Sequence, residues 1–201
     1  MERNKNIRRK NLRIANDEKI GEKAQEILKE IFENTNKWLN FAEAKNGALI
    51  GINGLFLFKS IDYLFDILNG KLKVDILVVG LMNAIFFIAI LMALKSFFPN
   101  TNVYIDKADV SDTDTSNKDR ILIFYGDICK YQSSKLYLRD IYKYYLEYNV
   151  KIEELKKIEL DYAKEILINS RITSYKFKLF SNAMKLNCIG IFIFILFLII
   201  A

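Results

Sequence analysis

The apolar residues of this chain are gathered into continuous blocks, and the charged residues fill the stretches between the blocks. The clearest block, Ile76 to Leu94, has 19 residues and no charge. A helix of about that length crosses the hydrocarbon core of a bilayer. A soluble domain with the same 52% hydrophobic content would spread its apolar residues at helical or strand spacing. The segregation therefore predicts an integral membrane protein.

An earlier block, residues 44–68, is less uniform. Its apolar part, Gly47 to Phe58, covers only about 18 Å as a helix, and the turns that follow carry Lys59, Asp62 and Asp66 on one face. Either the segment spans with this polar transmembrane face turned towards protein or water, or it crosses only part of the bilayer. In the simplest alternative, the two aspartates lie in the far headgroup region while Lys59 extends outward. Charges inside a membrane are costly and usually functional, so the first alternative would make the face part of the mechanism.

Between the blocks, helical spacing of apolar residues predicts a mainly α protein with cytoplasmic helices. A kink or break is possible at residues 34–36, where two asparagines and a threonine interrupt the apolar stripe. The run Ile121 to Tyr125 is either a short strand or a buried helical turn.

The expected segments are a basic disordered arm (1–16), a cytoplasmic helix capped by Asp17 (17–43), a transmembrane hairpin (44–98, with spans at about 44–68 and 76–95), a linker (99–119), a cytoplasmic helical domain (120–185) and a C-terminal transmembrane helix (186–201).

The distribution of Lys and Arg predicts the orientation. Eleven lie from Arg3 to Lys45 and sixteen lie from Lys95 to Lys185, whereas the turn between the first two spans has only Lys71 and Lys73. The positive-inside rule therefore places the N-terminus and the central domain in the cytoplasm, in a multi-pass membrane protein. The same rule accounts for the net charge of +6 without a nucleic-acid polymer as partner.

Composition also argues against an enzyme. Histidine is absent and the two cysteines, Cys129 and Cys188, lie in segments of different character. Zinc sites and histidine-activated nucleophiles therefore lack their parts, and we expect no catalytic residue and no metal. The carboxylates of Glu153, Glu154 and Glu159 lie beside lysines, as on a solvated helix face.

Small residues recur four apart at the membrane entry, a spacing that lets helices approach closely in lipid. They serve either packing within the chain, against the second span, or association with a second copy. The residues of this row are Ala44, Gly47, Ala48, Gly51 and Gly54.

Tyrosines and basic residues alternate between Tyr131 and Tyr148. Aromatic rings stack on bases and cations neutralise phosphate, so this segment could form a nucleotide surface. The simpler alternative is a helical core with the hydroxyls at its edge. Likewise, the basic residues from Arg171 to Lys185 serve either as an anchor on anionic lipid or as an anion site.

Three short motifs, in one order, resemble those of the Pycsar effector-like membrane proteins of bacterial anti-phage systems. Glu43-Ala44-Lys45 precedes Ala48-Leu49-Ile50-Gly51-Ile52-Asn53-Gly54, and Tyr125-Gly126-Asp127-Ile128 follows the linker. Asn169-Ser170-Arg171-Ile172, with Lys176-Phe177-Lys178, comes just before the last span. Glu43 stands where the family pattern leads us to expect Asp, and Asn46 where we expect a small residue.

The resemblance implies an abortive-infection effector that is activated by a cyclic nucleotide from a paired cyclase. The messenger would be a cyclic pyrimidine mononucleotide, and binding would rearrange or oligomerise the transmembrane helices and disrupt the inner membrane. The residues we expect to bind the ligand are Tyr125, Arg139, Asn169, Arg171 and Lys176. The alternatives are a membrane-anchored scaffold or adaptor, and a pore-forming toxin restrained by a protein antitoxin.

Overall fold

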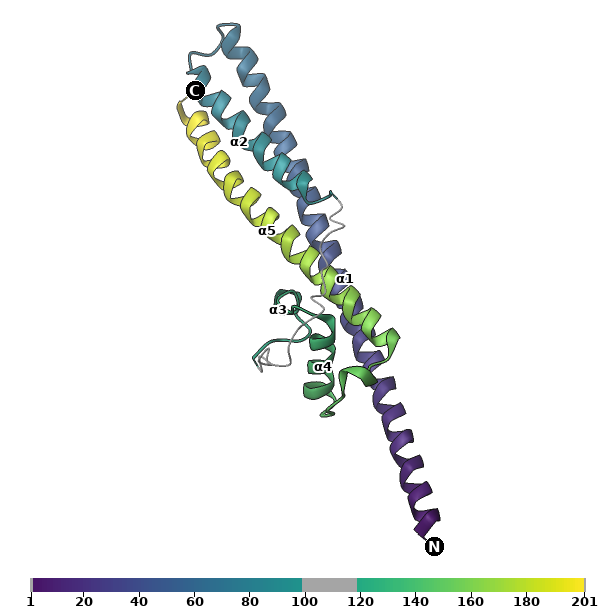
Figure 1. Cartoon of the computed structure of the whole chain (residues 1–201). Helices are drawn as coiled ribbons and strands as arrows, with labels where there is room; N and C mark the ends of the chain where they lie inside the picture. Colours follow the sequence, from purple (N-terminus) through teal and green to yellow (C-terminus); the bar gives the residue numbers. More distant parts are fainter. Residues whose placement is uncertain (1, 99–118, 201) are drawn as a thin grey trace. The chain divides into compact units, whose positions relative to one another are not determined.

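The computed structural model describes the backbone of residues 2–98 and 119–200 and the side chains of residues 17–98 and 119–199. This part of the chain contains helices and no strand, which confirms the mainly α expectation. The helices are α1 (Glu2–Leu68), α2 (Ile76–Lys95), α3 (Tyr125–Ile128), α4 (Ser134–Tyr145), a 3-10 turn η1 (Ile152–Glu154) and α5 (Lys157–Ile200) (Figure 1). Apart from Asp119, the expected linker 99–119 lies outside the described residues.

Within the described residues, three helical stretches are long and apolar enough to cross a membrane: Asp17–Leu68, Ile76–Lys95 and Lys157–Ile199. They contain the three spans that the apolar blocks predict. Glu43 and Asp62 are about 28 Å apart along α1, close to the thickness of the hydrocarbon core. The first block is thus long enough to span once its polar outer turns are included.

Helix α1 is longer and more regular than the sequence pattern indicates. Residues 2–16, expected as a disordered arm, continue the helix, and Asp17 lies inside it rather than capping its start. The helix also passes through residues 34–36 without a break. Thr35 is buried there and its hydroxyl donates to the Ile31 carbonyl at 2.8 Å, so this polar residue is satisfied within the helix itself.

The region between the spans contains less helix than expected. Residues 121–124 form a turn, closed by the Phe124 N–H donating to the Ile121 carbonyl, and α3 follows. Helix α4 ends at Tyr145 because Glu147 takes a left-handed conformation (φ 51°) and the Tyr148 N–H returns to the Tyr142 carbonyl. Helix α5 begins only at Lys157.

The chain divides into two compact units, and α1 and α5 each contribute a segment to both. Unit 1 comprises residues 1–38 and 102–171. In it, α3 and α4 pack on the segments of α1 and α5 (Figure 1). Its core is formed by buried aliphatic residues such as Leu28 and Ile141 together with three tyrosines, Tyr131, Tyr137 and Tyr142.

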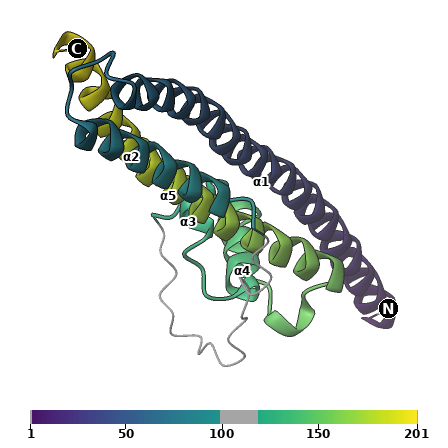
Figure 2. The ribbon, with the colours of Figure 1, turned by 90° about the horizontal axis from the view of Figure 1, so that it is seen from above.

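Unit 2 comprises residues 39–101 and 172–201, with α1, α2 and α5 side by side in both views (Figures 1 and 2). Helix α2 runs back along α1 after the turn at Asn69–Gly70, and Asp75 caps its start by accepting from the Leu77 N–H. The Phe56 ring stacks on Phe86 of α2 and meets Phe194 of α5 edge-on. Ring packing of this kind ties the three apolar helices together.

Candidate functional site

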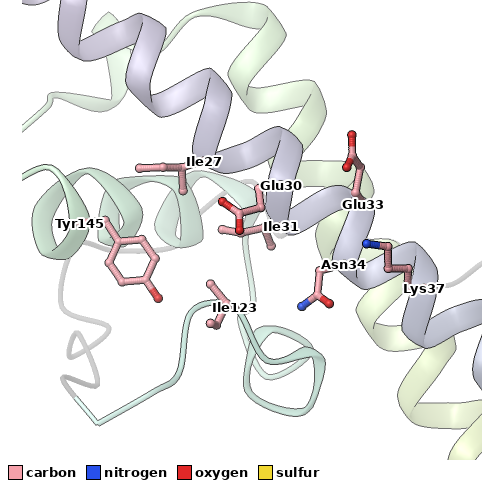
Figure 3. Close-up of a pocket in the computed structure, with 8 residues that line it drawn as sticks. All are labelled: Ile27, Glu30, Ile31, Glu33, Asn34, Lys37, Ile123 and Tyr145. Carbon is pink, nitrogen blue, oxygen red and sulfur yellow. The ribbon is translucent and has the colours of Figure 1, made fainter.

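Unit 1 contains a cavity of about 330 Å³ between α1, the turn before α3 and the end of α4 (Figure 3). Its apolar lining consists of Ile27, Ile31, Ile123 and the ring of Tyr145. Its polar lining consists of Glu30, Glu33, Asn34 and Lys37. We call this cavity the unit 1 pocket.

The helical repeat of α1 forms one wall of the pocket. Residues 27, 30, 31, 34 and 37 are three or four positions apart, so they lie on one face of the helix. This face carries two isoleucines together with polar side chains, unlike the wholly apolar face expected of a core helix. The α1 wall thus supplies an apolar floor and several hydrogen-bonding groups over about three turns.

Two residues from elsewhere in the sequence complete the pocket. Ile123 belongs to the turn before α3, and Tyr145 is the last residue of α4. The left-handed Glu147 stops α4 directly after Tyr145, which leaves this ring at the helix end, across the cavity from Ile27 (Figure 3). Partial burial raises the pKa of the Tyr145 hydroxyl, so this group remains a hydrogen-bond donor at neutral pH.

A set of buried tyrosine hydroxyls supports the helices behind the pocket. Tyr137 donates to the Leu122 carbonyl at 2.8 Å, one residue before pocket residue Ile123. Tyr131 donates to Asp140 at 2.8 Å, and Tyr142 donates to Glu159 at 2.9 Å. Burial raises the pKa of all three tyrosines, and the bonds from Tyr131 and Tyr142 to carboxylates raise the pKa of these two further. These tyrosines form a hydrogen-bonded core, which is the simpler of the two sequence interpretations.

The buried carboxylates correct one sequence interpretation. Glu159, which the charge pattern places on a solvated face, is fully buried. Besides the Tyr142 hydroxyl, it accepts the Lys156 N–H at 3.2 Å, as the third residue of a helix reaching back to its cap does. Both bonds go to one carboxylate oxygen, Oε2, and they stabilise this polar group inside the core.

Four of the five expected ligand residues lie in unit 1, each with a contact inside the unit. Tyr125 packs on Trp38, with ring centroids 5.5 Å apart, and the Arg139 Nε lies 3.9 Å from Asp140. Asn169 donates to the Asn36 side chain at 2.8 Å, and Arg171 donates to the Tyr131 carbonyl at 2.6 Å. None of the four lines the unit 1 pocket. Their role in binding stays a prediction.

The fifth residue, Lys176, lies in unit 2. Its ammonium nitrogen is 2.8 Å from Glu43, and it also lies over the Phe97 ring, 5.7 Å from the centroid. Glu43 is therefore the partner of a nearly buried lysine. Lys45 beside it is placed over the rings of Phe41, Phe177 and Phe180.

The row of small residues mostly faces outward from unit 2. Ala44, Gly47, Ala48 and Gly51 are exposed, and a Cβ on Gly51 or Gly54 would have no neighbour within 4 Å. Within the described residues, the close helix contact is instead at Gly190 of α5, where a Cβ would lie 3.0 Å from Ile85 and Phe86. The row is therefore not what packs α1 on α2, and association with a second copy remains its predicted role.

The polar transmembrane face is also exposed on unit 2. Lys59 and Asp62 lie 4.0 Å apart with side chains 57% and 68% exposed, and Asp66 pairs with Lys71 beyond the end of α1. These groups do not turn towards α2 or α5. Their position near the turn, a membrane thickness from Glu43, fits the headgroup alternative.

The residues that line the unit 1 pocket were not expected from the sequence. The signal available was the mixture of Ile27 and Ile31 with Glu30, Asn34 and Lys37 on one helical face. Nothing in the local pattern connects that face with Ile123 and Tyr145, which are about a hundred residues away. Among the described residues, no group of three or more potential ligand side chains is placed to hold a metal ion.

Comparison with known proteins identifies the family. A family model described as the Pycsar effector protein domain matches residues 27–201, which include both the pocket wall and all three apolar blocks. The chain belongs to the Pycsar effector family. It is thus an anti-phage effector, and three of its described helices are long and apolar enough to span a membrane. No curated protein and no solved structure matched this Pycsar effector.

Proposed function

We propose that this effector is activated when a cyclic mononucleotide binds in the unit 1 pocket, and that binding rearranges the spans and breaches the inner membrane. The messenger would come from a paired cyclase in the cytoplasm. The excess of Lys and Arg on both sides of the hairpin supports a cytoplasmic unit 1. The observation that carries the proposal is the pocket itself, because it combines a cation, an amide and an aromatic ring around an apolar floor.

The volume and charge of the pocket favour a small ligand with little charge. At about 330 Å³ it is at the lower end of small-molecule sites, which suits one nucleotide better than a linked pair. Lys37 is the single cation among its lining residues, and Glu30 and Glu33 lie near it. A cyclic monophosphate carries one negative charge, whereas a polyphosphate would bring several into the field of two carboxylates.

Each lining group has a plausible part in binding such a ligand. The Lys37 ammonium would pair with the cyclic phosphate, and the Tyr145 ring would stack on the base. The Asn34 amide can both donate to and accept from a base edge. A carboxylate such as Glu30 accepts a hydrogen bond from a ribose hydroxyl, as acidic residues do in dinucleotide sites.

The connectivity of the helices supports coupling between binding and the spans. The α1 segment that lines the pocket continues in the same helix to the first span, and α5 likewise supplies both units. A ligand that favours one packing of these segments shifts the populations of the states that contain it. The required coupling is a difference in ligand affinity between a quiet and an active state.

Titration calorimetry of the purified full chain in detergent with cyclic UMP and cyclic CMP tests the proposal. We expect Lys37→Met and Tyr145→Leu each to weaken binding at least tenfold. Lys29→Met is the matched control, because Lys29 is an exposed lysine of the same helix outside the pocket, and it should bind as the wild type does. Unchanged affinity in Lys37→Met and Tyr145→Leu would reject the pocket, and the absence of binding by the wild type would reject these messengers.

A further inference from the structure

Helix α1 carries a polar side chain at every seventh position through its membrane segment. Asn46, Asn53 and Ser60 are 0% exposed in unit 2, so all three face the interior between the helices. Because seven residues are nearly two helical turns, they form one row over about 21 Å. We call these three residues the polar row.

The polar row is only partly satisfied by hydrogen bonds. Asn46 donates to the Ala42 carbonyl at 2.9 Å and to the Lys176 carbonyl of α5 at 3.3 Å. Ser60 donates to Asn83 of α2 at 2.7 Å. For Asn53, in the middle, neither side-chain polar atom has a hydrogen-bond partner among the described residues.

A polar side chain on another helix of unit 2 is also buried and only partly hydrogen-bonded. Asn187 of α5 is 2% exposed, and its Oδ1 has no hydrogen-bond partner within the described part of the chain. Amides in membrane helices are costly unless they are paired, and they usually join helices by hydrogen bonds. That role explains Ser60 with Asn83, but not Asn53. An unpaired interior amide in a span indicates a function in another state.

The exposed side of the same helix has the opposite character. Ile52, Leu55 and Phe58 are about half exposed or more, and Ala48 and Gly51 are exposed just before them on the same helix. Over this stretch the outward face of α1 is apolar, as lipid requires, and the three residues of the polar row lie on the inward face. The polar row meets water only if the helices of unit 2 separate.

We propose that the polar row lines a water-filled path through the membrane in the activated effector. The inference rests on the proposed function, because it assumes that messenger binding opens unit 2. Once the helices part, water satisfies the Asn53 amide that the quiet state leaves unpaired. Because asparagine and serine are uncharged, the path would pass small ions of either sign with little preference.

Cysteine accessibility in the full chain tests this proposal. The background replaces Cys129 and Cys188 by serine, and Asn53→Cys is compared with Ile52→Cys, its exposed neighbour at the same depth. Each variant is reconstituted in vesicles that contain potassium. A charged, membrane-impermeant methanethiosulfonate reagent is then added before or after the cyclic nucleotide that activates the wild type, and potassium release is recorded.

We expect the reagent to change messenger-induced potassium release at least threefold in Asn53→Cys and to leave Ile52→Cys unchanged. Before the messenger is added, neither variant should be modified. As a second variant, Asn53→Leu should fold and bind nucleotide with wild-type affinity but release potassium at least fivefold more slowly.

Two outcomes would overturn the proposal. In the first, the reagent does not change messenger-induced potassium release in Asn53→Cys, and Asn53→Leu releases potassium as fast as the wild type does. The other is strong selection of cations over anions by the wild type. Both would leave the proposed function standing, whereas a wild type that releases no potassium with the messenger would remove that function itself.

Discussion

The Lys176 ammonium nitrogen lies 2.8 Å from a carboxylate oxygen of Glu43, although the two residues are 133 positions apart in the chain. The pair connects α5 with α1 in unit 2. Glu43 precedes the first apolar block of the chain, and Lys176 precedes the last one. The two side chains differ in environment: Lys176 is 9% exposed and Glu43 is 43% exposed. One turn further along α1, Asn46 of the polar row donates to the Lys176 carbonyl.

This asymmetry predicts unequal effects of removing either charge. Glu43→Gln leaves a nearly buried ammonium without its carboxylate and should cost about 2 kcal/mol. Lys176→Met leaves a carboxylate that water reaches, and should cost less than about 1 kcal/mol. Thermal unfolding in detergent measures the order of the two variants.

If the pair also holds unit 2 closed, both variants should leak potassium from vesicles without messenger. The exchanged pair Glu43→Lys with Lys176→Glu serves as the control and should recover most of the lost stability and tightness. Equal stability of the two single variants, with no recovery in the exchange, would contradict this account of the pair.

The Tyr142 hydroxyl is predicted to stabilise unit 1 through Glu159. Tyr142→Phe removes a hydrogen bond to a fully buried carboxylate and should cost about 2–3 kcal/mol. Tyr148→Phe is the matched control, because its hydroxyl bonds Asp17 at an exposed site and its loss should cost less than about 1 kcal/mol. Urea unfolding followed by tyrosine fluorescence compares the two variants; similar losses would mean that burial of Glu159 is not what gives the bond its value.

The end of α4 predicts a stabilising substitution. Glu147 has φ 51°, a conformation that costs most residues about 1 kcal/mol but suits glycine. Glu147→Gly should therefore raise the free energy of unfolding by several tenths of a kcal/mol to about 1 kcal/mol. The position of Tyr145 in the pocket should be kept, so nucleotide affinity should not change. A lower stability than that of the wild type would contradict the left-handed end of α4.

Two glycines of the membrane helices should respond differently to the same change. Gly190→Leu places atoms where Ile85 and Phe86 lie, and should lower the thermal midpoint in detergent through overpacking of about 1–3 kcal/mol. Gly51→Leu meets open space and should leave that midpoint unchanged. If the row of small residues joins two copies, Gly51→Leu should instead reduce crosslinking between copies. A lower thermal midpoint in Gly51→Leu, with an unchanged midpoint in Gly190→Leu, would contradict this account of the two glycines.

Much of the fold could be predicted from the sequence because the bilayer imposes length and apolarity on each span. The block Ile76–Leu94 corresponds closely to α2, and the C-terminal block is the end of α5. The helix boundaries between the spans were harder to predict. No break occurs at residues 34–36, where the Thr35 hydroxyl is satisfied within the helix, and the apolar run that begins at Ile121 is a turn followed by α3.

The candidate site was less predictable than the fold for a physical reason. Its wall alternates Ile27 and Ile31 with polar residues, a pattern that solvated helices also show. Only the tertiary structure brings Ile123 and Tyr145 to that wall. Likewise, Glu43 has an obvious role only beside Lys176.

Potassium release from vesicles that contain the purified wild-type chain tests the central claim most directly. Cyclic UMP or cyclic CMP is added to vesicles of anionic lipid with unit 1 outside, and Lys37→Met in parallel vesicles reports whether the pocket transmits the signal. The account predicts tight vesicles before addition, release after it, and at least tenfold more nucleotide needed for Lys37→Met. Release that is the same with and without nucleotide, or no release at any concentration, would contradict it.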